Sequence, residues 1–288
     1  MDERELKKLV GEIIGTEHIL DDCAVASCGG ELLVATTDML HEETDFPAGM
    51  TDWQIGWMSA AVTISDIAAM GARPSLVLLA VGLDRSGRLR SILEGAKDCC
   101  ERCGAVLAGG DLDSHRELTI VSSGIGFTDR ATLVRRSGAL PGELIGITGT
   151  PGRAQAALDG YRRFERFLFE PMPMPVEGRK LAQAGVTSMM DISDGLVASL
   201  HDMLDANQCG FSIDSSLLPR IEGIDPALSR EYSLFGAGDF GLLFTCPSGI
   251  LPITGVDIRV IGTVIEERLV LVDGIVAPDR GYLHQWQK

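Results

Sequence analysis

The sequence predicts a protein of two α/β domains. Segments with strand periodicity alternate with segments of helix periodicity in both halves of the chain, which is the pattern of α/β folds. Apolar residues make up 45% of the 288 residues, enough for two cores at about 100–200 residues per domain. Gly138 and Pro141-Gly142 form a turn between the halves, so we expect domains at 1–139 and 140–288.

The elements of the first half follow from local patterns. Charged and apolar residues alternate at helical spacing over 2–14, and Gly29-Gly30 separates two β-rich runs. The segment 41–52 is polar, and we expect it to be a loop. The expected helices are 2–14, 53–70 and 86–103, and the expected strands are 23–28, 31–37, 74–83, 105–110 and 117–127.

The second half repeats the alternation. A strand at 144–150 leads through a glycine turn into a helix that begins near Arg153, and another helix is expected at 194–206. Three prolines within 161–180 predict an irregular segment there. Further strands are expected in the runs FSID, GLLFTC, IRVIGTVI and RLVLVDGIV.

The charge excludes a broad class of function. The formal net charge is −16 at pH 7, which disfavours nucleic-acid binding because such binding relies on Lys and Arg contacts to phosphate. No apolar run approaches the ~20 residues of a membrane span, and the N-terminus lacks the pattern of a signal peptide. We therefore expect a cytoplasmic protein that binds neither nucleic acid nor membrane.

The seven cysteines complete no metal or disulfide pattern. Cys100 and Cys103 form a CxxC with Cys99 beside them, but no second pair or nearby histidine completes a zinc site. We expect reduced thiols in a cytosolic core, and a redox role for these three is the weaker alternative.

The helix predicted at 53–70 carries an unexpected charge. Its apolar residues leave hardly any polar face, so the helix is expected to be buried. Ser59, Thr63 and Asp66 are spaced by four and three and form one narrow polar stripe. A salt bridge to Arg73 would be a structural explanation for Asp66, but a charge on such a helix favours a functional role.

Other aspartates follow strands or lie in apolar context. A buried, unpaired carboxylate costs several kcal/mol, so it must be paired, protonated or bound to metal. Few basic residues lie near these segments, and carboxylate and hydroxyl oxygens are the ligands that Mg²⁺ prefers. The aspartates concerned are Asp21, Asp22, Asp38, Asp66, Asp111, Asp191, Asp194 and Asp239.

Each piece also has a purely structural explanation. Asp38 could cap a turn, Ser193 or Asp194 could be the N-cap of the following helix, and Gly109-Gly110 could be a tight turn. Together the residues favour a site in which metal ions hold a substrate phosphate, because so many carboxylates would otherwise repel it.

Familiar nucleotide-binding and catalytic motifs are absent from the sequence. TGTPGR (148–153) ends a strand and starts a helix, where backbone N–H groups could bind an anion, but it is not a P-loop. Protein-kinase signatures are missing, and the histidines show no nucleophile–base spacing. If ATP binds, no glycine-loop-plus-lysine cradle holds it.

The motifs taken together resemble those of the thiamine-monophosphate kinases, a family of the aminoimidazole ribonucleotide synthetase superfamily. SDIAAMGARP (65–74) and DISDGL (191–196) are together quite specific for this group. The other matching stretches, in the family's order and spacing, are DDCAV (21–25), TTDML (36–40), AGGD (108–111), RRSGALPGE (135–143), TGTPG (148–152), GAGDFGLLFT (236–245) and GYLH (281–284).

The resemblance implies a fold and an activity. The fold would be the α/β (α+β) two-domain fold of aminoimidazole ribonucleotide synthetase, with an N-terminal ATP- and metal-binding domain that forms a dimeric β-barrel with a second subunit. The activity would be ATP- and Mg²⁺-dependent phosphorylation of thiamine monophosphate to thiamine diphosphate by direct in-line transfer. Two alternatives stay open: a relative acting on another phosphorylated acceptor, and a non-catalytic nucleotide-binding homologue.

The resemblance also implies residue roles. The family's metal-ligand positions match Asp22, Thr36, Thr37, Asp38, Asp66, Asp111, Asp191 and Asp194. Its ATP-contacting positions match Gly110, Asp111, Arg136 and Ser193. The carboxylates expected to act in catalysis are Asp38, Asp66, Asp111 and Asp194. Asp239 keeps a motif position to which no role is assigned.

The acceptor side departs from the family's pattern. Asp45 stands where the family has a substrate-contacting histidine, and Gly238 stands where it has a substrate-contacting glutamate. Tyr282 keeps its substrate-contact position, so these three are the candidate acceptor residues. A thiazolium cation could be met by Asp45 or by the aromatic face of Tyr282 or Trp286. A changed acceptor is the alternative.

Overall fold

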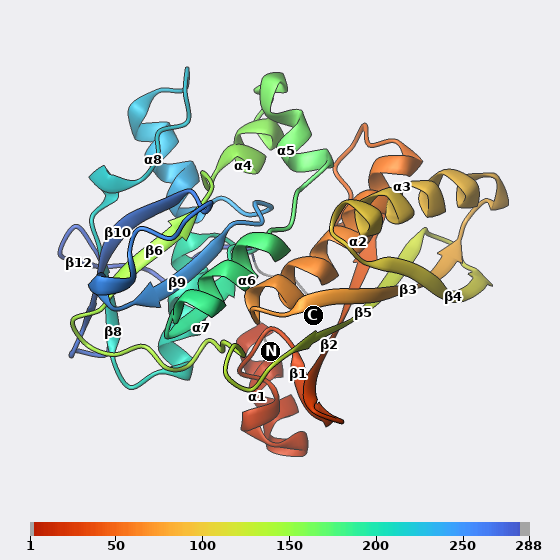
Figure 1. Ribbon diagram of the computed structural model, residues 1–288. Coiled ribbons are helices and arrows are strands. Elements are labelled where there is room, and N and C mark those ends of the chain that lie inside the picture. Colours follow the sequence, from red (N-terminus) through yellow and green to blue (C-terminus); the bar gives the residue numbers. More distant parts are fainter. Residues whose placement is uncertain (1–2, 283–288) are drawn as a thin grey trace.

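The computed structural model describes residues 3–282, whose strands form two sheets that lie side by side with helices packed around them (Figure 1). The first sheet has the strand order β1-β2-β5-β3-β4, and the second has the order β12-β11-β8-β10-β6-β9-β7. The first sheet consists of β1 (Ala24–Cys28), β2 (Glu31–His41), β3 (Arg73–Leu83), β4 (Val106–Ser114) and β5 (Thr119–Thr128). The second consists of β6 (Leu144–Thr148), β7 (Ser188–Asp191), β8 (Gly210–Ile213), β9 (Leu242–Cys246), β10 (Ile258–Ile265), β11 (Val270–Val272) and β12 (Ile275–Val276).

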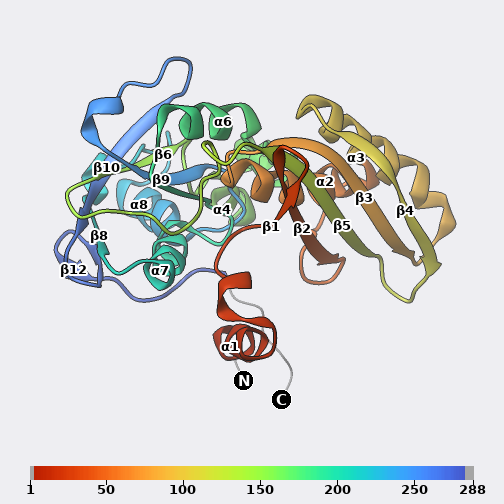
Figure 2. The ribbon, with the colours of Figure 1, turned by 60° about the horizontal axis from the view of Figure 1, so that its bottom comes forward.

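The α-helices connect and cover these strands. They are α1 (Glu3–Ile14), α2 (Asp52–Ala69), α3 (Leu89–Arg102), α4 (Arg153–Leu158), α5 (Glu165–Phe169), α6 (Pro175–Ala184), α7 (Leu196–Ala206) and α8 (Pro226–Phe235). Helix α1 projects from the rest of the molecule (Figure 2). Within residues 3–282, no helix has the length and apolar character that crossing a membrane would require.

The first sheet is covered on one face and edged by an exposed strand. β3 and β4 are parallel and joined through α3, whereas β2 and β3 each pair with β5 in antiparallel fashion. Positions along β5 alternate between buried and half-buried, and the buried ones face α2. β4 is the exposed edge, where Val106 and Leu112 are 62% and 56% exposed. The sheet is open in the single chain, so the dimeric β-barrel stays a prediction.

Helices α2 and α3 pack backbone against backbone. A Cβ atom added at Gly56 of α2 would lie 1.8 Å from the carbonyl oxygen of Ile92. A Cβ atom added at Gly95 of α3 would lie 1.8 Å from the carbonyl oxygen of Trp53. Glycine at these two positions therefore allows the two helices to pack closely.

Helix α2 also contacts the second half of the chain. Thr51 and Gln54 form a capping box that begins α2. The Gln54 side chain donates to Glu170 at 3.1 Å, and Trp57 Nε1 donates to the Pro171 carbonyl oxygen at 2.7 Å. The predicted all-apolar helix is thus buried because it lies between the two halves (Figure 1).

Most elements expected from the sequence are confirmed, and four differ. The segment 161–180, expected to be irregular, contains α5 and the start of α6, because Pro175 occupies the first turn of α6, where a missing N–H costs nothing. β7 and α8 were not predicted. Asp273-Gly274 form a turn that divides one predicted strand into β11 and β12. The cysteines are free, as expected.

Candidate active site

The site begins where α2 approaches β2. Gly124 of β5 leaves room for this approach, since a Cβ atom there would lie 2.4 Å from Cγ2 of Thr63. Thr63 Oγ1 donates to Asp38 Oδ2 at 2.6 Å, and Thr36 Oγ1 donates to Asp66 Oδ2 at 2.7 Å. Thr63 and Asp66 of the polar stripe therefore contact the middle of β2. Ser59, its third member, instead donates to the Ile55 carbonyl of its own helix.

Asp191 joins this group from the second sheet. It ends β7, is 2% exposed, and accepts a hydrogen bond from Ser65 Oγ of α2 at 2.6 Å. Ser193 Oγ donates to the other oxygen of Asp191 at 3.3 Å. Ser65 was not predicted as a site residue, although it directly precedes Asp66 in the motif SDIAAMGARP.

Asp21 and Asp22 are held by the two arginines of the segment between the sheets. Arg136 Nη2 donates to Asp22 Oδ1 at 2.7 Å, and Arg135 forms an ion pair with Asp21. The second carboxylate oxygen of Asp22 is buried and has no hydrogen-bond partner, and the same holds for Nε of Arg136. The residue predicted to contact ATP is therefore paired with a predicted metal ligand.

Three carboxylates meet at one point. Oxygen atoms of Asp22, Asp66 and Asp191 all lie within 4.8 Å of one another. Burial, followed by the charges of Asp38 and Asp191, raises the pKa of Asp66 well above its usual range. Burial and the charge of Asp22 raise the pKa of Asp191 to about 7. We call Asp22, Asp38, Asp66 and Asp191 the aspartate cluster.

The cluster fits a divalent cation. Its donors are hard oxygen atoms, one of them orphaned, and a cation would relieve the repulsion that raises these pKa values. No ion pair joins Asp66 to Arg73 among the described residues, so the salt bridge considered from the sequence is not formed.

The structure does not bring every predicted ligand to this cluster. Thr37 points away from α2, because neighbouring side chains of a strand point to opposite faces, and its Oγ1 donates to the Ser122 carbonyl at 3.1 Å. Asp111 is exposed on β4, opposite Ala80 of β3.

Gly110 is equally distant from the cluster. It shares a row of the sheet with Asp38, but Ser122 of β5 and Leu79 of β3 lie between them in that row. Three strand spacings amount to roughly 14 Å. Gly110 and Asp111 therefore do not reach the cluster within one chain.

Two cavities flank the cluster. The first, which we call the acceptor cavity, has a volume of about 550 Å³ and is lined by all three candidate acceptor residues. The second has about 700 Å³ and is lined by Asp22 and Arg136 with Lys7, His201 and other residues. Asp66 lines both cavities. Residues shared by the acceptor cavity and the predicted site are Asp38, Asp45, Asp66, Asp191, Ser193, Asp194, Gly238 and Tyr282.

Asp239 has a structural partner in the TGTPG turn. Asp239 is 7% exposed and accepts the Gly152 N–H at 2.6 Å, so it anchors the turn of TGTPG. Burial raises the pKa of Asp239 to about 6.

Neither Ser193 nor Asp194 caps α7, because its N-cap is Gly195. Trp286 lies outside the described residues.

The fold and the site together define the class of protein. The chain matches the model of the AIR synthase related protein N-terminal domain over residues 20–128 and the model of the corresponding C-terminal domain over residues 168–273. The first matched segment contains Asp22, Asp38 and Asp66 of the aspartate cluster, and the second contains Asp191.

Relatives narrow the class to a family. Thiamine-monophosphate kinase of Methanospirillum hungatei is 48% identical over 99% of this chain and 100% of its own length, and that of Halobacterium salinarum is 39% identical over 86% and 85%. The solved structure of AaThiL complexed with AMPPCP and TMP superposes with a TM-score of 0.92 at 27% identity, covering 99% of this chain and 97% of AaThiL. The chain belongs to the thiamine-monophosphate kinase family.

Proposed function

We propose that this protein transfers the γ-phosphoryl group of ATP directly to thiamine monophosphate and forms thiamine diphosphate. The observation that carries the proposal is the 48% identity to a thiamine-monophosphate kinase over the whole of both chains. The match to AaThiL, solved with AMPPCP and TMP, supports it at the level of the fold.

The aspartate cluster supports a role for Mg²⁺. Asp22, Asp66 and Asp191 would hold the metal, with Asp38 and Asp194 beside them. Bound Mg²⁺ would supply positive charge that offsets the repulsion between two phosphate-bearing reactants. Thr36, Thr63 and Ser65 keep the carboxylates oriented through hydrogen bonds of 2.6–2.7 Å.

The two cavities support separate binding sites for the two substrates. The cavity with Arg136 offers a guanidinium to the ATP phosphates, and the acceptor cavity offers Asp45, Gly238 and Tyr282 to thiamine monophosphate. Asp66 borders both, so the donor and acceptor phosphates would meet beside it. No general base is required, because the attacking oxygen of a phosphate monoester is already ionised near pH 7.

Gly110 and Asp111 point to a homodimer. Both lie on the exposed edge strand β4, roughly 14 Å along the sheet from Asp38. A second copy paired at this edge would extend the open sheet toward the predicted barrel and could bring its own Gly110 and Asp111 to the site. We retain the division into domains at 1–139 and 140–288 as part of this proposal.

The experiment is a product assay on the purified protein. With ATP, Mg²⁺ and thiamine monophosphate, we expect equal amounts of ADP and thiamine diphosphate by chromatography, and no product when a chelator removes the metal. Other phosphate monoesters serve as competing acceptors. ADP release with one of them, and none with thiamine monophosphate, would contradict the proposed acceptor. ATP binding without turnover of any acceptor would contradict catalysis.

A further inference from the structure

The charged side chains that line the acceptor cavity all have the same sign. They are Asp38, Glu43, Asp45, Asp66, Asp191 and Asp194. Among the described residues, no lysine, arginine or histidine borders this cavity. The lining otherwise includes apolar side chains such as Phe46, Met58 and Phe240. An occupant that is only anionic would be repelled, whereas one with positive charge beside its phosphate would be favoured.

The lining carboxylates fall into two groups. Asp38, Asp66, Asp191 and Asp194 belong to the aspartate cluster or its immediate surroundings. Glu43 and Asp45 come instead from the loop 42–51 between β2 and α2. Of these two, Glu43 is exposed and Asp45 is half-buried, so Asp45 is the carboxylate placed to meet a group of the acceptor other than the phosphate.

Asp45 is held in place by neutral donors. Its Oδ2 accepts the His41 N–H at 2.8 Å and the Thr44 hydroxyl at 2.7 Å. Its Oδ1 lies 3.5 Å from the Tyr282 hydroxyl, a weak contact. No lysine or arginine forms an ion pair with Asp45 in the part of the chain that the structure describes. The carboxylate is thus oriented by the protein while its charge is left for a ligand.

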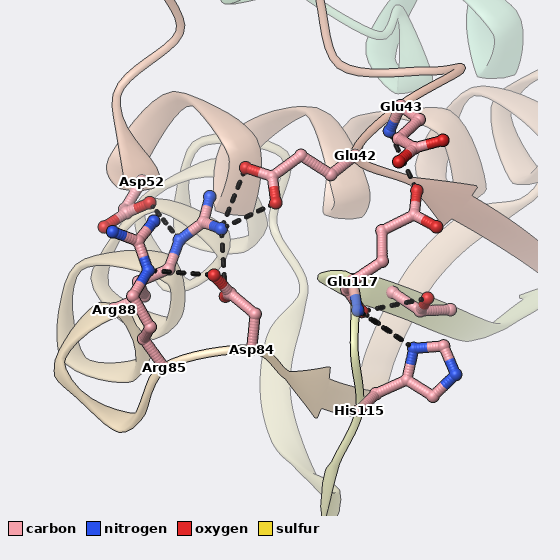
Figure 3. A network of polar contacts seen from close by, with 9 residues as sticks. Glu42, Glu43, Asp52, Asp84, Arg85, Arg88, His115 and Glu117 are labelled. Atoms are coloured by element: carbon pink, nitrogen blue, oxygen red, sulfur yellow. Dashed lines mark hydrogen bonds and ion pairs between the residues drawn. The ribbon is translucent and has the colours of Figure 1, made fainter.

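The loop that carries Asp45 is clamped at both ends by one arginine. Arg88 is 6% exposed; its Nε donates to Asp52 at 2.7 Å, and its Nη1 contacts Glu42 at 2.8 Å and Asp84 at 3.0 Å (Figure 3). Glu42 begins the loop and Asp52 follows its end. Because a buried guanidinium with three carboxylate partners has little freedom, it fixes the span of the loop.

We propose that Asp45 is a specificity-determining residue that selects acceptors with a positively charged organic group beside the phosphate, and that Arg88 is the positioning residue for its loop. The inference rests on the proposed function, because the thiazolium ring of thiamine monophosphate is such a group. The aromatic ring of Tyr282 offers a second surface for a cation next to the carboxylate.

The test compares a charged acceptor with a neutral one on the same protein preparation. Thiamine monophosphate is compared with an analogue in which an uncharged thiophene replaces the thiazolium ring. Asp45→Asn keeps the size of the side chain and removes its charge. We expect its KM for thiamine monophosphate to rise about tenfold, with less than about twofold change for the thiophene analogue and for ATP. Asp257→Asn, an exposed carboxylate outside the cavity, is the matched control.

The ratio of the two KM values decides the outcome. An equal rise for both acceptors overturns the inference, because shape would then be recognised instead of charge, and so does an unchanged KM. Arg88→Lys is expected to raise the KM for thiamine monophosphate more than that for the thiophene analogue, because Arg88 acts through the loop of Asp45, while kcat changes little. An equal rise for both acceptors, an effect on kcat alone, or no effect contradicts the positioning role.

A binding measurement distinguishes failure of this inference from failure of the proposed function. If the unmodified protein does not phosphorylate thiamine monophosphate, calorimetric titration with both compounds still measures the preference for the cation. A preference that Asp45→Asn abolishes supports the inference even then. Equal affinity of the unmodified protein for the two compounds overturns it.

Discussion

At the scale of single residues, the dominant feature is crowding of like charges. Asp22, Asp66 and Asp191 lie within 4.8 Å of one another, and Arg136 is paired with only the first of them. Burial and mutual repulsion disfavour the ionised forms of Asp66 and Asp191. The cluster therefore costs the protein stability when no cation is bound, which is the expected signature of a functional site.

Replacing Asp66 should lower activity but raise the stability of the metal-free protein. Asp66→Asn keeps an acceptor for the Thr36 hydroxyl but removes one negative charge. We expect turnover to fall by at least about 100-fold, because a carboxylate ligand is lost. We also expect the metal-free variant to be more stable by about 1–2 kcal/mol, measured by thermal unfolding. A lower melting temperature would indicate a structural role for Asp66.

The same crowding predicts the sign of a pH effect. The pKa of Asp191 is raised from 3.8 to about 7 in the folded protein, so the folded state binds more protons than the unfolded state between these values. The unfolding free energy of the metal-free protein should therefore fall as pH rises from about 4 to 7. Asp66→Asn should reduce this fall, and an identical pH profile in both proteins would contradict the coupling.

At the scale of elements, α2 organises the site. One helix supplies Asp66, orients Asp38 through Thr63, and orients Asp191 through Ser65. Its position depends on a close backbone contact with α3 at Gly56 and on the Thr63 side chain, which lies against Gly124 of β5. Glycine at these points determines how near the helix can come, and therefore whether the hydroxyl groups reach the carboxylates.

A methyl group at the crossing of α2 and α3 should disturb both packing and site. Gly56→Ala puts a Cβ atom 1.8 Å from the Ile92 carbonyl oxygen, so the helices must separate. We expect a loss of about 2–4 kcal/mol in unfolding free energy, measured by denaturant titration, together with reduced turnover. Gly87→Ala is the control, since no atom lies within 4 Å of its added Cβ; a similar loss there would refute the packing explanation.

At the scale of the whole molecule, strand β4 forms an exposed edge of the first sheet in the single chain. β4 exposes Val106, Leu112 and the predicted ATP-contacting pair Gly110-Asp111. An exposed, apolar edge strand tends to pair with another chain. In the proposed dimer, Gly110 and Asp111 of the second copy would complete the site that one chain forms only in part.

A charge on this edge should therefore affect assembly and activity together. For Leu112→Lys we expect a shift from dimer to monomer by light scattering and at least a tenfold loss of turnover at low protein concentration. Ile275→Lys replaces a residue that is 73% exposed on β12 and should change neither property. A fully active monomer of the unmodified protein would contradict the dimer.

Local sequence patterns predicted the fold class, most element positions and the identity of the unusual carboxylates. Helix periodicity revealed that α2 is apolar nearly all round, and this made Asp66 stand out before any contact was known. Local patterns did not reveal α8, β7 or α6 in full, because their formation depends on packing against distant segments and on where prolines fall in a turn.

Which of those carboxylates lie together depends on the tertiary structure. Asp22, Asp66 and Asp191 are far apart along the chain and meet because α2 lies between the two sheets. Asp239 does not belong to this group, because its carboxylate accepts a backbone N–H at the TGTPG turn. Asp111 does not belong to it either, because the strand order places β4 at the edge of the first sheet, two strands away from β5. No local pattern encodes this strand order. A short stretch of sequence shows which chemical groups are present. Which of these groups lie close together depends on contacts between segments far apart in the chain.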